Sequence, residues 1–157
     1  MHADYTIHDA SAEDDALIAH HYLALWDSYG FSRSQHLPDS ATIVRAFIDE
    51  ARHASEFKAF LCRTEGVAVA SAACQVRHAP YPEVLQPEVR KIGYIWSLYV
   101  APTHRRRGIA RRLMQACTDH LRDIDCTSSI LHSSDAAMPL YKSLGFEGTS
   151  ELRLKLR

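Results

Sequence analysis

The chain has 157 residues, of which 46% are hydrophobic and 24% charged, and its formal net charge is −1. This length and composition are typical of a globular protein with one core, so we expect a single domain over residues 1–157. The near-zero charge argues against a protein that gathers nucleic acid or membranes by its overall field, and no apolar run reaches the roughly 18 residues of a membrane span.

The N-terminus and the cysteines favour a cytoplasmic protein. The first residues are acidic and lack the apolar stretch of a signal peptide. Cys62, Cys74, Cys117 and Cys126 form no CxxC pair, which is typical of free thiols in a reducing compartment. The ten histidines are scattered and form no HExxH motif, so we expect no metal site.

The first half of the chain predicts two helices set among short strands. Apolar residues recur at helical spacing after Ser11, whose side chain can cap the first helix, and this pattern ends at Gly30. Two β-rich runs flank Thr64, Glu65 and Gly66, which are typical of a hairpin turn. The expected elements are a strand at residues 5–8, helices at 11–30 and from 38, and strands at 57–63 and 67–77.

A loop with three prolines, residues 78–90, precedes a second half in which strands and helices alternate. We expect strands at 91–100, 128–133 and 147–156, and helices at 107–123 and 136–144. The order β-α-α-β-β-β-α-β-α-β predicts an α/β fold with a mixed sheet (α+β mixed sheet). The reason is that hairpin strands run antiparallel, whereas strands joined by crossover helices run parallel. The apolar, aromatic strand at 91–100 is expected inside the sheet.

A basic loop joins that strand to the helix that follows it. Arginines at 105–107 precede Gly108 and Ala110, whose small side chains allow a ligand to approach the backbone closely. Free N–H groups at a helix start favour anions, and the helix dipole adds about 0.3–1 kcal/mol. The pattern predicts a phosphate cradle, which a pyrophosphate fits well, and the alternative is a basic run that forms only a solvated surface. The pattern is neither a Walker A loop nor a Rossmann fingerprint, since it has one glycine and no Gly-Lys-Ser/Thr ending.

Two motifs, in this order, resemble those of the GCN5-related N-acetyltransferase (GNAT) superfamily. Arg105-x-x-Gly108-x-Ala110 is similar to the family signature Arg/Gln-x-x-Gly-x-Gly/Ala, at the expected strand-to-helix junction. Residues 137–146, AMPLYKSLGF, resemble the second family motif, Ala-x-x-x-Tyr-x-x-x-Gly-Phe. The motifs lie within residues 91–147, while the element order matches over the whole chain. The resemblance implies the GNAT-like acyl-CoA N-acyltransferase fold and acetyl-CoA as co-substrate.

The resemblance also implies where the co-substrate binds. In the family, the backbone of the strand before the loop bonds the pantetheine arm, which corresponds here to Leu98, Tyr99 and Val100. The pyrophosphate is held by amides of the loop and helix start. The residues implied there are Arg105, Arg106, Arg107, Gly108, Ile109, Ala110 and Arg111. Ser134 stands where many members have Asn, so its contact with CoA departs from the family pattern.

Tyr141 matches the family tyrosine that lies near the CoA sulfur, which implies a catalytic role. As an amine attacks the thioester carbonyl, the hydroxyl can donate to the departing sulfur, since tyrosine, with a pKa of about 10, is still protonated where a thiol, with a pKa of about 8.5, leaves as a thiolate. A positioned general acid contributes about 10²–10⁴-fold. A backbone N–H near Tyr99 or Val100 would polarise the carbonyl. The structural alternative for Tyr141 is an aromatic residue packed on its helix.

The sequence does not single out the general base that deprotonates the amine or the amine substrate that accepts the acetyl group. A primary amine is mostly protonated near pH 7, so a group must accept its proton. The candidates are Ser97 with a water, Glu83, Glu88, His104, His132 and Tyr94. Trp26, Tyr29 and Phe31 lie where family members often place a substrate wall, and Tyr94 and Trp96 lie on the inner strand. No acidic cluster there signals a polycation such as an aminoglycoside.

Three functions remain open from the sequence. The first is an N-acetyltransferase acting on a primary amine of a small molecule or of a peptide or protein N-terminus. The second is a non-catalytic acyl-CoA-binding module or sensor, because no base is evident. The third is a nucleic-acid-binding domain that uses arginines 105–112, which requires strongly salt-dependent binding. Exposed sheet edges would allow a homodimer, which the sequence neither requires nor excludes.

Overall fold

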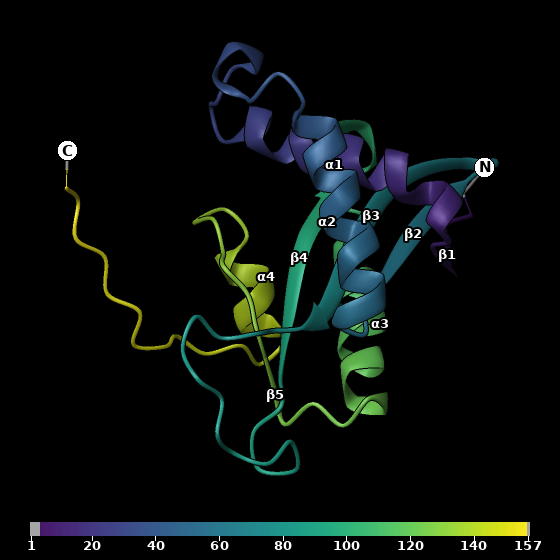
Figure 1. Cartoon of the computed structure of the whole chain (residues 1–157). Helices are drawn as coiled ribbons and strands as arrows, with labels where there is room; N and C mark the ends of the chain where they lie inside the picture. Colours follow the sequence, from purple (N-terminus) through teal and green to yellow (C-terminus); the bar gives the residue numbers. More distant parts are fainter. Residues whose placement is uncertain (1–3, 157) are drawn as a thin grey trace.

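The computed structural model describes residues 4–156, so residues 1–3 and 157 of the expected domain, with the first part of the acidic N-terminus, lie outside the described residues. Strands and helices follow one another as β1-α1-α2-β2-β3-β4-α3-β5-α4 (Figure 1). Their bounds are β1 Thr6–Asp9, α1 Asp15–Ser28, α2 Ser40–Ala54, β2 Lys58–Thr64, β3 Val67–Val76, β4 Ile92–Val100, α3 Ile109–Asp123, β5 Ser128–Ile130 and α4 Met138–Ser143. Single 3-10 turns occur at Ala12–Asp14, Arg33–Gln35 and Pro102–His104.

The strands form one mixed sheet in the order β1-β2-β3-β4-β5. Strands β1 to β4 pair antiparallel, whereas β4 and β5 run parallel. The tight turn between β2 and β3 makes a hairpin, and α3 supplies the crossover that a parallel pair requires. The predicted mixed sheet is therefore confirmed, and β4 lies between two neighbours as its apolar composition indicated.

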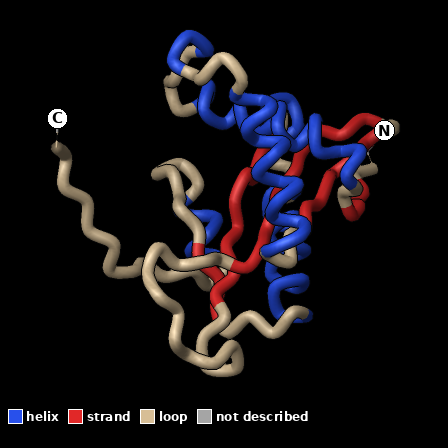
Figure 2. Tube along the Cα trace, in the orientation of Figure 1, coloured by secondary structure: helices blue, strands red, loops and turns tan. Residues whose placement is uncertain are grey.

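Helices cover both faces of the sheet (Figure 2). On one face, Ile18 of α1 and Ile48 of α2 are fully buried and belong to the same cluster as Leu61 of β2. On the other face, Leu113 of α3 packs in a cluster with Cys74 of β3. Successive residues of a strand point to opposite faces, so each strand feeds both clusters. The core thus fixes α1 and α3 on opposite sides of β4.

The close approach of α3 to β4 depends on Gly93. A Cβ atom at this position would lie 2.6 Å from Cδ1 of Leu121. That separation is far below the roughly 3.5–4.0 Å of favourable carbon contacts, so any larger residue would displace Leu121 or the helix. Glycine therefore sets how deeply α3 sits on the sheet, and with it where the start of α3 lies.

The prediction of a strand at residues 147–156 is wrong. This segment is extended but pairs with no strand in the described chain, and it runs away from the body of the molecule (Figure 1). Its alternating Leu152, Leu154 and Leu156 are 94%, 80% and 87% exposed. Alternation marks a segment able to form a strand, but a strand also needs a neighbouring edge that supplies hydrogen bonds. The order predicted from the sequence is correct up to α4 and lacks its final strand.

The elements beside this segment are shorter than expected. β5 ends at Ile130 rather than 133, and α4 begins at Met138 rather than 136. Ser134 does not cap α4 with its side chain; instead, its carbonyl accepts from the N–H groups of Ala137 and Met138. The helix ends before Gly145, as the sequence predicted, and this glycine has a φ of +89°.

Candidate active site

β4 loses its neighbour on one side halfway along its length. β5 pairs with Ile92, Gly93 and Tyr94 only, whereas β4 continues to Val100. No other described strand takes up this side of residues 95–100. Backbone N–H and C=O groups need hydrogen-bond partners, so an extended ligand arm can bind along this edge as a further strand would.

A bulge in β4 bends the strand at this point. Trp96 pairs with Ala73 and Tyr99 with Ser71, so β4 carries one residue more than β3 between these pairs. Ser97 lies in that stretch with a φ of +57°, which residues other than glycine adopt uncommonly. A bulge twists and bends a strand locally. The bulge therefore re-aims the second half of β4, where Leu98, Tyr99 and Val100 lie.

A buried histidine supports the bulge. Nδ1 of His21 lies 2.8 Å from the Ser71 hydroxyl, and its ring stacks on the Tyr99 ring with centroids 4.4 Å apart. Burial, with a smaller contribution from His20, lowers the pKa of His21 to about 4. His21 is thus uncharged near neutral pH, and its ring packs against the Tyr99 side chain. Because that side chain is occupied, only the backbone of Tyr99 is available to a ligand.

The loop after β4 has the backbone geometry of an anion cradle. Arg106 and Gly108 have φ of +63° and +76°, and Gly108 occupies the N-cap position of α3. Within the described chain, the N–H groups of residues 106–111 have no hydrogen-bond acceptor. Nothing lies within 4 Å of a Cβ placed on Gly108. Unpaired amides at a helix start attract anions, and left-handed residues among them form a concave nest.

The arginine side chains support this loop more than they line it. Arg105 Nε donates to the Val100 carbonyl at 3.1 Å, which ties the loop to the end of β4. Arg111 donates to the Ser143 hydroxyl at 2.7 Å, which joins the start of α3 to α4. Arg107 lies over the ring of Tyr5, 6.0 Å from its centroid. The same arginines keep the cradle positive.

Ile109 and Ala110 differ in their roles at the start of α3. Ile109 is 2% exposed and packs in the core, so only its N–H is available to a ligand. Ala110 is partly exposed on the first turn. The structure therefore brings the sequence-predicted residues 98–100 and 105–111 together along the end of β4 and the loop that follows it.

Tyr141 lies on α4 in a mostly apolar setting. Its side chain is 8% exposed and its ring meets Phe146 edge-on, with centroids 6.0 Å apart. Burial, with smaller contributions from Tyr29 and Cys117, raises the pKa of Tyr141 to about 12. The hydroxyl has no hydrogen-bond partner among the described residues. A phenol in this setting keeps its proton and can donate it, but cannot act as a base near neutral pH.

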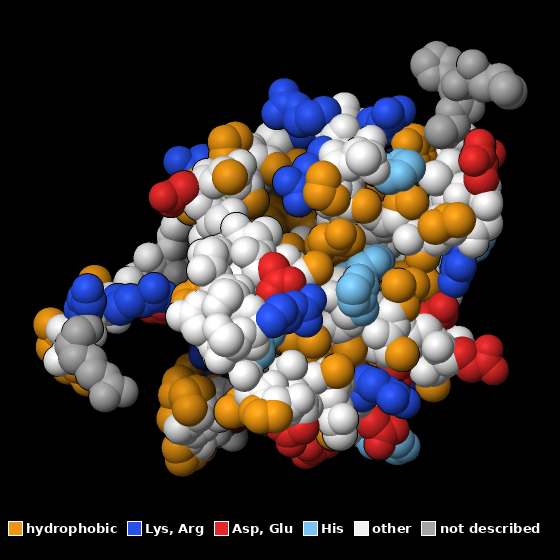
Figure 3. Space-filling view, turned by 90° about the horizontal axis from the view of Figure 1, so that it is seen from above, with side chains coloured by type: hydrophobic (Ala, Val, Ile, Leu, Met, Phe, Trp, Pro, Cys, Tyr) orange, Lys and Arg blue, Asp and Glu red, His pale blue; other side chains and the backbone are white. Residues whose placement is uncertain are grey.

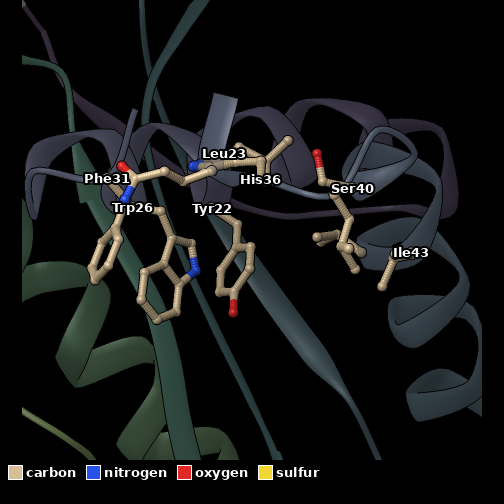
Figure 4. Close-up of a pocket in the computed structure, with 10 residues that line it drawn as sticks. Tyr22, Leu23, Trp26, Phe31, His36, Ser40 and Ile43 are labelled. Atoms are coloured by element: carbon tan, nitrogen blue, oxygen red, sulfur yellow. The ribbon is translucent and has the colours of Figure 1, made fainter. Parts of the chain in front are cut away.

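An aromatic cleft lies on the α1–α2 side of β4. It consists of two cavities, of 550 and 360 Å³, which share Tyr22, Trp26, Ile43 and Val44. Figure 4 shows the rings of Tyr22, Trp26 and Phe31 along one wall of the smaller cavity. The predicted substrate-wall residues Trp26, Tyr29 and Phe31 thus lie at this cleft. Tyr22, Phe47 and Gln75 also line it. Sequence reasoning missed Tyr22 and Phe47 because helical spacing alone does not tell core from cleft, and Gln75 because it lies on β3, where nothing in the sequence links it to the cleft.

Three of the six candidate bases line the larger cavity, namely Tyr94, Ser97 and His132. The other three do not line either cavity. Glu83 and Glu88 lie in the exposed loop between β3 and β4, and His104 bonds the hydroxyl of Tyr5 at 3.0 Å. The Ser97 hydroxyl is buried and has no hydrogen-bond partner within the part of the chain that the structure describes.

Tyr94 and His132 belong to a hydrogen-bonded chain that ends on Glu151. The Tyr94 hydroxyl lies 2.7 Å from His132 Nδ1, and His132 Nε2 lies 2.8 Å from Glu151 Oε2. The bond from His132 and its charge, with Arg153 beside it, lower the pKa of Glu151. Burial, with smaller effects of Tyr22 and Glu151, raises the pKa of Tyr94. Glu151 was missed from the sequence, where nothing links it to His132.

Two further findings bear on function. Among residues 4–156, no helix is both long and apolar enough to cross a membrane. Over the same residues, no three or more His, Cys, Asp or Glu side chains are grouped so that they could hold a metal ion.

Known proteins with similar sequences are acetyltransferases. The chain is 31% identical over 71 residues to an aminoglycoside N(6')-acetyltransferase type 1 of Acinetobacter haemolyticus, covering 41% of this chain and 47% of that protein. It is 32% identical over 68 residues to a glucosamine 6-phosphate N-acetyltransferase of Trypanosoma brucei brucei, covering 43% and 46%. The chain therefore spans about half the length of the curated relatives it matches.

The fold and the family model agree with these relatives. The structure of a predicted acetyltransferase with acetyl-CoA from Clostridium acetobutylicum superposes with a TM-score of 0.81 at 21% identity, covering 98% of this chain and 97% of that one. This likeness confirms the GNAT-like fold that the sequence predicted. The model of the acetyltransferase (GNAT) family matches residues 19–146, which is most of the chain. The chain belongs to the acetyltransferase (GNAT) family.

Proposed function

We propose that this protein is an N-acetyltransferase that moves the acetyl group of acetyl-CoA to a primary amine by direct attack on the thioester. The acceptor is a small molecule or the N-terminus of a peptide or protein. The observation that carries the proposal is that the free edge of β4 continues directly into the unpaired amides of residues 106–111. The hydrogen bond between Arg111 and Ser143 holds α4, which carries Tyr141, beside the same start of α3. Membership of the family supports the proposal.

In this proposal the co-substrate binds mainly to backbone. The amides of residues 106–111, centred on Gly108, hold the diphosphate, and the free edge of Leu98, Tyr99 and Val100 bonds the pantetheine arm. Ser134 contributes a further polar contact from the turn before α4. The side chains of Arg105 and Arg111 are engaged within the chain, which supports a role in shaping the cradle rather than an exposed nucleic-acid surface.

Tyr141 is the proposed general acid. Its raised pKa, about 12, keeps the phenol protonated, so its O–H can donate a hydrogen bond to the CoA sulfur and stabilise the negative charge that develops there as the tetrahedral intermediate collapses. An N–H of β4 near Tyr99 would stabilise the oxyanion, because a fixed dipole in a dry site costs no reorganisation during the reaction.

The chain of Tyr94, His132 and Glu151 is the proposed proton acceptor. Ionised Glu151 accepts from His132 Nε2–H, which leaves Nδ1 free to accept from the Tyr94 hydroxyl. As the amine gives a proton to the Tyr94 oxygen, the phenol proton moves to His132, and the imidazolium that forms lies beside the Glu151 carboxylate. In this proposal the hydrogen-bonded series of Tyr94, His132 and Glu151 is the general base. The lack of an evident base in the sequence was the reason to consider a non-catalytic acyl-CoA-binding module.

An amine-panel assay with detection of free thiol tests the function. An acetyltransferase releases CoA thiol only when acetyl-CoA and an amine are both present, and the product gains one acetyl group by mass. Tight binding of acetyl-CoA without release of CoA thiol in the presence of any amine would instead identify a non-catalytic acyl-CoA-binding module.

Two further expectations remain proposals. A cytoplasmic location is supported by Cys62, Cys74, Cys117 and Cys126, all free thiols in the structure. A homodimer is supported by the unpaired, leucine-bearing segment at residues 147–156, since a second copy can supply the edge that the segment lacks. Light scattering at several protein concentrations tests the dimer.

A further inference from the structure

We infer that the acceptor amine is carried on an apolar, aromatic body of arylalkylamine type, and not on a polycationic or phosphorylated sugar. This inference rests on the proposed function and concerns the choice of amine. It is drawn from the aromatic cleft, defined here as the two adjoining cavities of 550 and 360 Å³ beside β4.

The walls of the aromatic cleft are rings held in fixed orientations. Trp96 meets Tyr22 and Phe47 edge-on, with centroids 5.6 and 5.4 Å apart. Trp26 meets Phe31 in the same way at 5.5 Å. The indole N–H of Trp96 donates to Gln75 Oε1 at 3.1 Å, which fixes that ring. Rings fixed in this way offer flat apolar faces and edges, which recognise another aromatic ring by shape and by its quadrupole.

These walls are exposed to solvent in the absence of a ligand. Trp26 and Phe47 are 39% and 50% exposed, and Phe31 and Ile43 are exposed as well. In the view onto the end where α1 leads into α2, hydrophobic side chains lie open on the surface (Figure 3). A concave apolar patch of this kind is typical of a binding site, and covering it with an apolar body is favourable.

Charge separates this acceptor from the sugars. Among residues 4–156, no Asp, Glu, Lys or Arg side chain lines either cavity. Two carboxylates that contact lining histidines are engaged: Asp27, 3.6 Å from His36, binds Arg33 at 2.8 Å, and Glu151 binds His132. A polycation needs several free carboxylates, and a phosphate needs cationic side chains or a second cradle. An apolar surrounding also favours the neutral amine, the form that attacks the thioester.

Two unpaired polar atoms mark where the ends of such a ligand lie. Ser97, next to Leu98, lines the larger cavity, and its buried hydroxyl has no hydrogen-bond partner among residues 4–156. His36 lines the smaller cavity, and its buried Nε2 lies 3.6 Å from an Asp27 oxygen, with no hydrogen-bond partner in the described part of the chain. Leaving a buried polar atom unpaired is costly. In this inference the amine lies towards Ser97 and a single polar substituent on the ring lies towards His36, where a small side-chain movement would give each buried atom a partner.

The two tryptophans make a direct binding test available. Trp26 and Trp96 are the chain's only tryptophans, and both line the cleft. With CoA present, 2-phenylethylamine and tyramine are expected to change the tryptophan emission saturably, tyramine more tightly, while kanamycin and glucosamine 6-phosphate leave it unchanged. Turnover of the same four amines is followed by free thiol, with kcat/KM at least about tenfold higher for the aromatic pair, as expected for burial of a ring.

Binding and turnover separate the two proposals. Aromatic amines that bind without thiol release overturn the acetyltransferase proposal and keep this inference. Release of CoA thiol with kanamycin or glucosamine 6-phosphate as acceptor, without a change of emission or turnover with the aromatic amines, overturns this inference and leaves the acetyltransferase proposal standing. An emission spectrum that depends on protein concentration assigns the cleft to a second copy and also overturns it.

A variant pair adds a matched control. Phe47→Ala is expected to raise KM for 2-phenylethylamine about tenfold, by loss of ring contacts, and to leave KM for acetyl-CoA unchanged. Leu85→Ala, at an exposed leucine outside the cleft, should change neither. Equal effects of the two variants would overturn the inference.

Discussion

Replacing Tyr141 by Phe removes one hydroxyl and keeps the ring. The contact with Phe146 and the burial of the ring remain, and the hydroxyl has no partner within the described chain, so unfolding free energy should change by less than about 1 kcal/mol. Loss of a positioned general acid should lower kcat by about 10²–10⁴-fold, which corresponds to about 2.7–5.4 kcal/mol in the barrier. Affinity for CoA should be unchanged, because the proposed cradle lies on α3.

The pH profile tests the assignment of Tyr141 further. Because its pKa is raised to about 12, the phenol keeps its proton well above neutral pH. The profiles of wild type and Tyr141→Phe should therefore run parallel up to about pH 10, offset by a constant factor. Single-turnover thiol release between pH 6 and 10 measures both quantities. An unchanged kcat across this range, or a loss of turnover matched by a loss of CoA affinity, would refute the role of Tyr141 as acid.

Three further predictions follow from the same structure. Glu151→Gln should lower kcat at neutral pH, because a neutral amide stabilises the imidazolium that forms on His132 during the reaction less than a carboxylate does; an unchanged kcat would exclude Glu151. The pKa of His21 is about 4 in the folded protein and about 6.5 in the unfolded chain, so the unfolded chain binds an extra proton between these pH values. The contribution of His21 to wild-type stability should therefore be complete above pH 6.5 and be lost as the pH falls towards 4. His21→Asn should flatten the melting temperature over this pH range. Leu113→Ala should lower the unfolding free energy in urea by about 2–5 kcal/mol, against little change for exposed Leu85→Ala.

The local parts of the molecule could be predicted from the sequence. Apolar spacing indicated α1, α2 and α3, and the run of apolar and aromatic residues indicated an inner strand at β4. The cradle was also local, because Gly108 and the surrounding amides lie within a few residues of one another. Helix starts and tight turns depend on neighbouring residues, so their signals appear in the sequence.

The distant contacts could not be predicted. The strand expected at residues 147–156 needs a neighbour, and nothing in its alternation says which edge supplies one. The bond between His132 and Glu151 joins the turn after β5 to that same segment, and the stack of His21 on Tyr99 joins α1 to β4. The bulge at Ser97 depends on the register between β3 and β4, which is set by the whole sheet.

Calorimetric titration of CoA tests the central claim most directly, because it reports the amide cradle without any acceptor. The wild-type protein should bind CoA, and Gly108→Glu should not, because a carboxylate would occupy the open space beside the cradle. Gly66→Glu is the matched control: Gly66 also has a left-handed φ, +78°, and open surroundings, but it lies in the β2–β3 turn, so this variant should bind as wild type does. Absence of CoA binding by the wild-type protein, or equal binding by Gly108→Glu, would contradict the account.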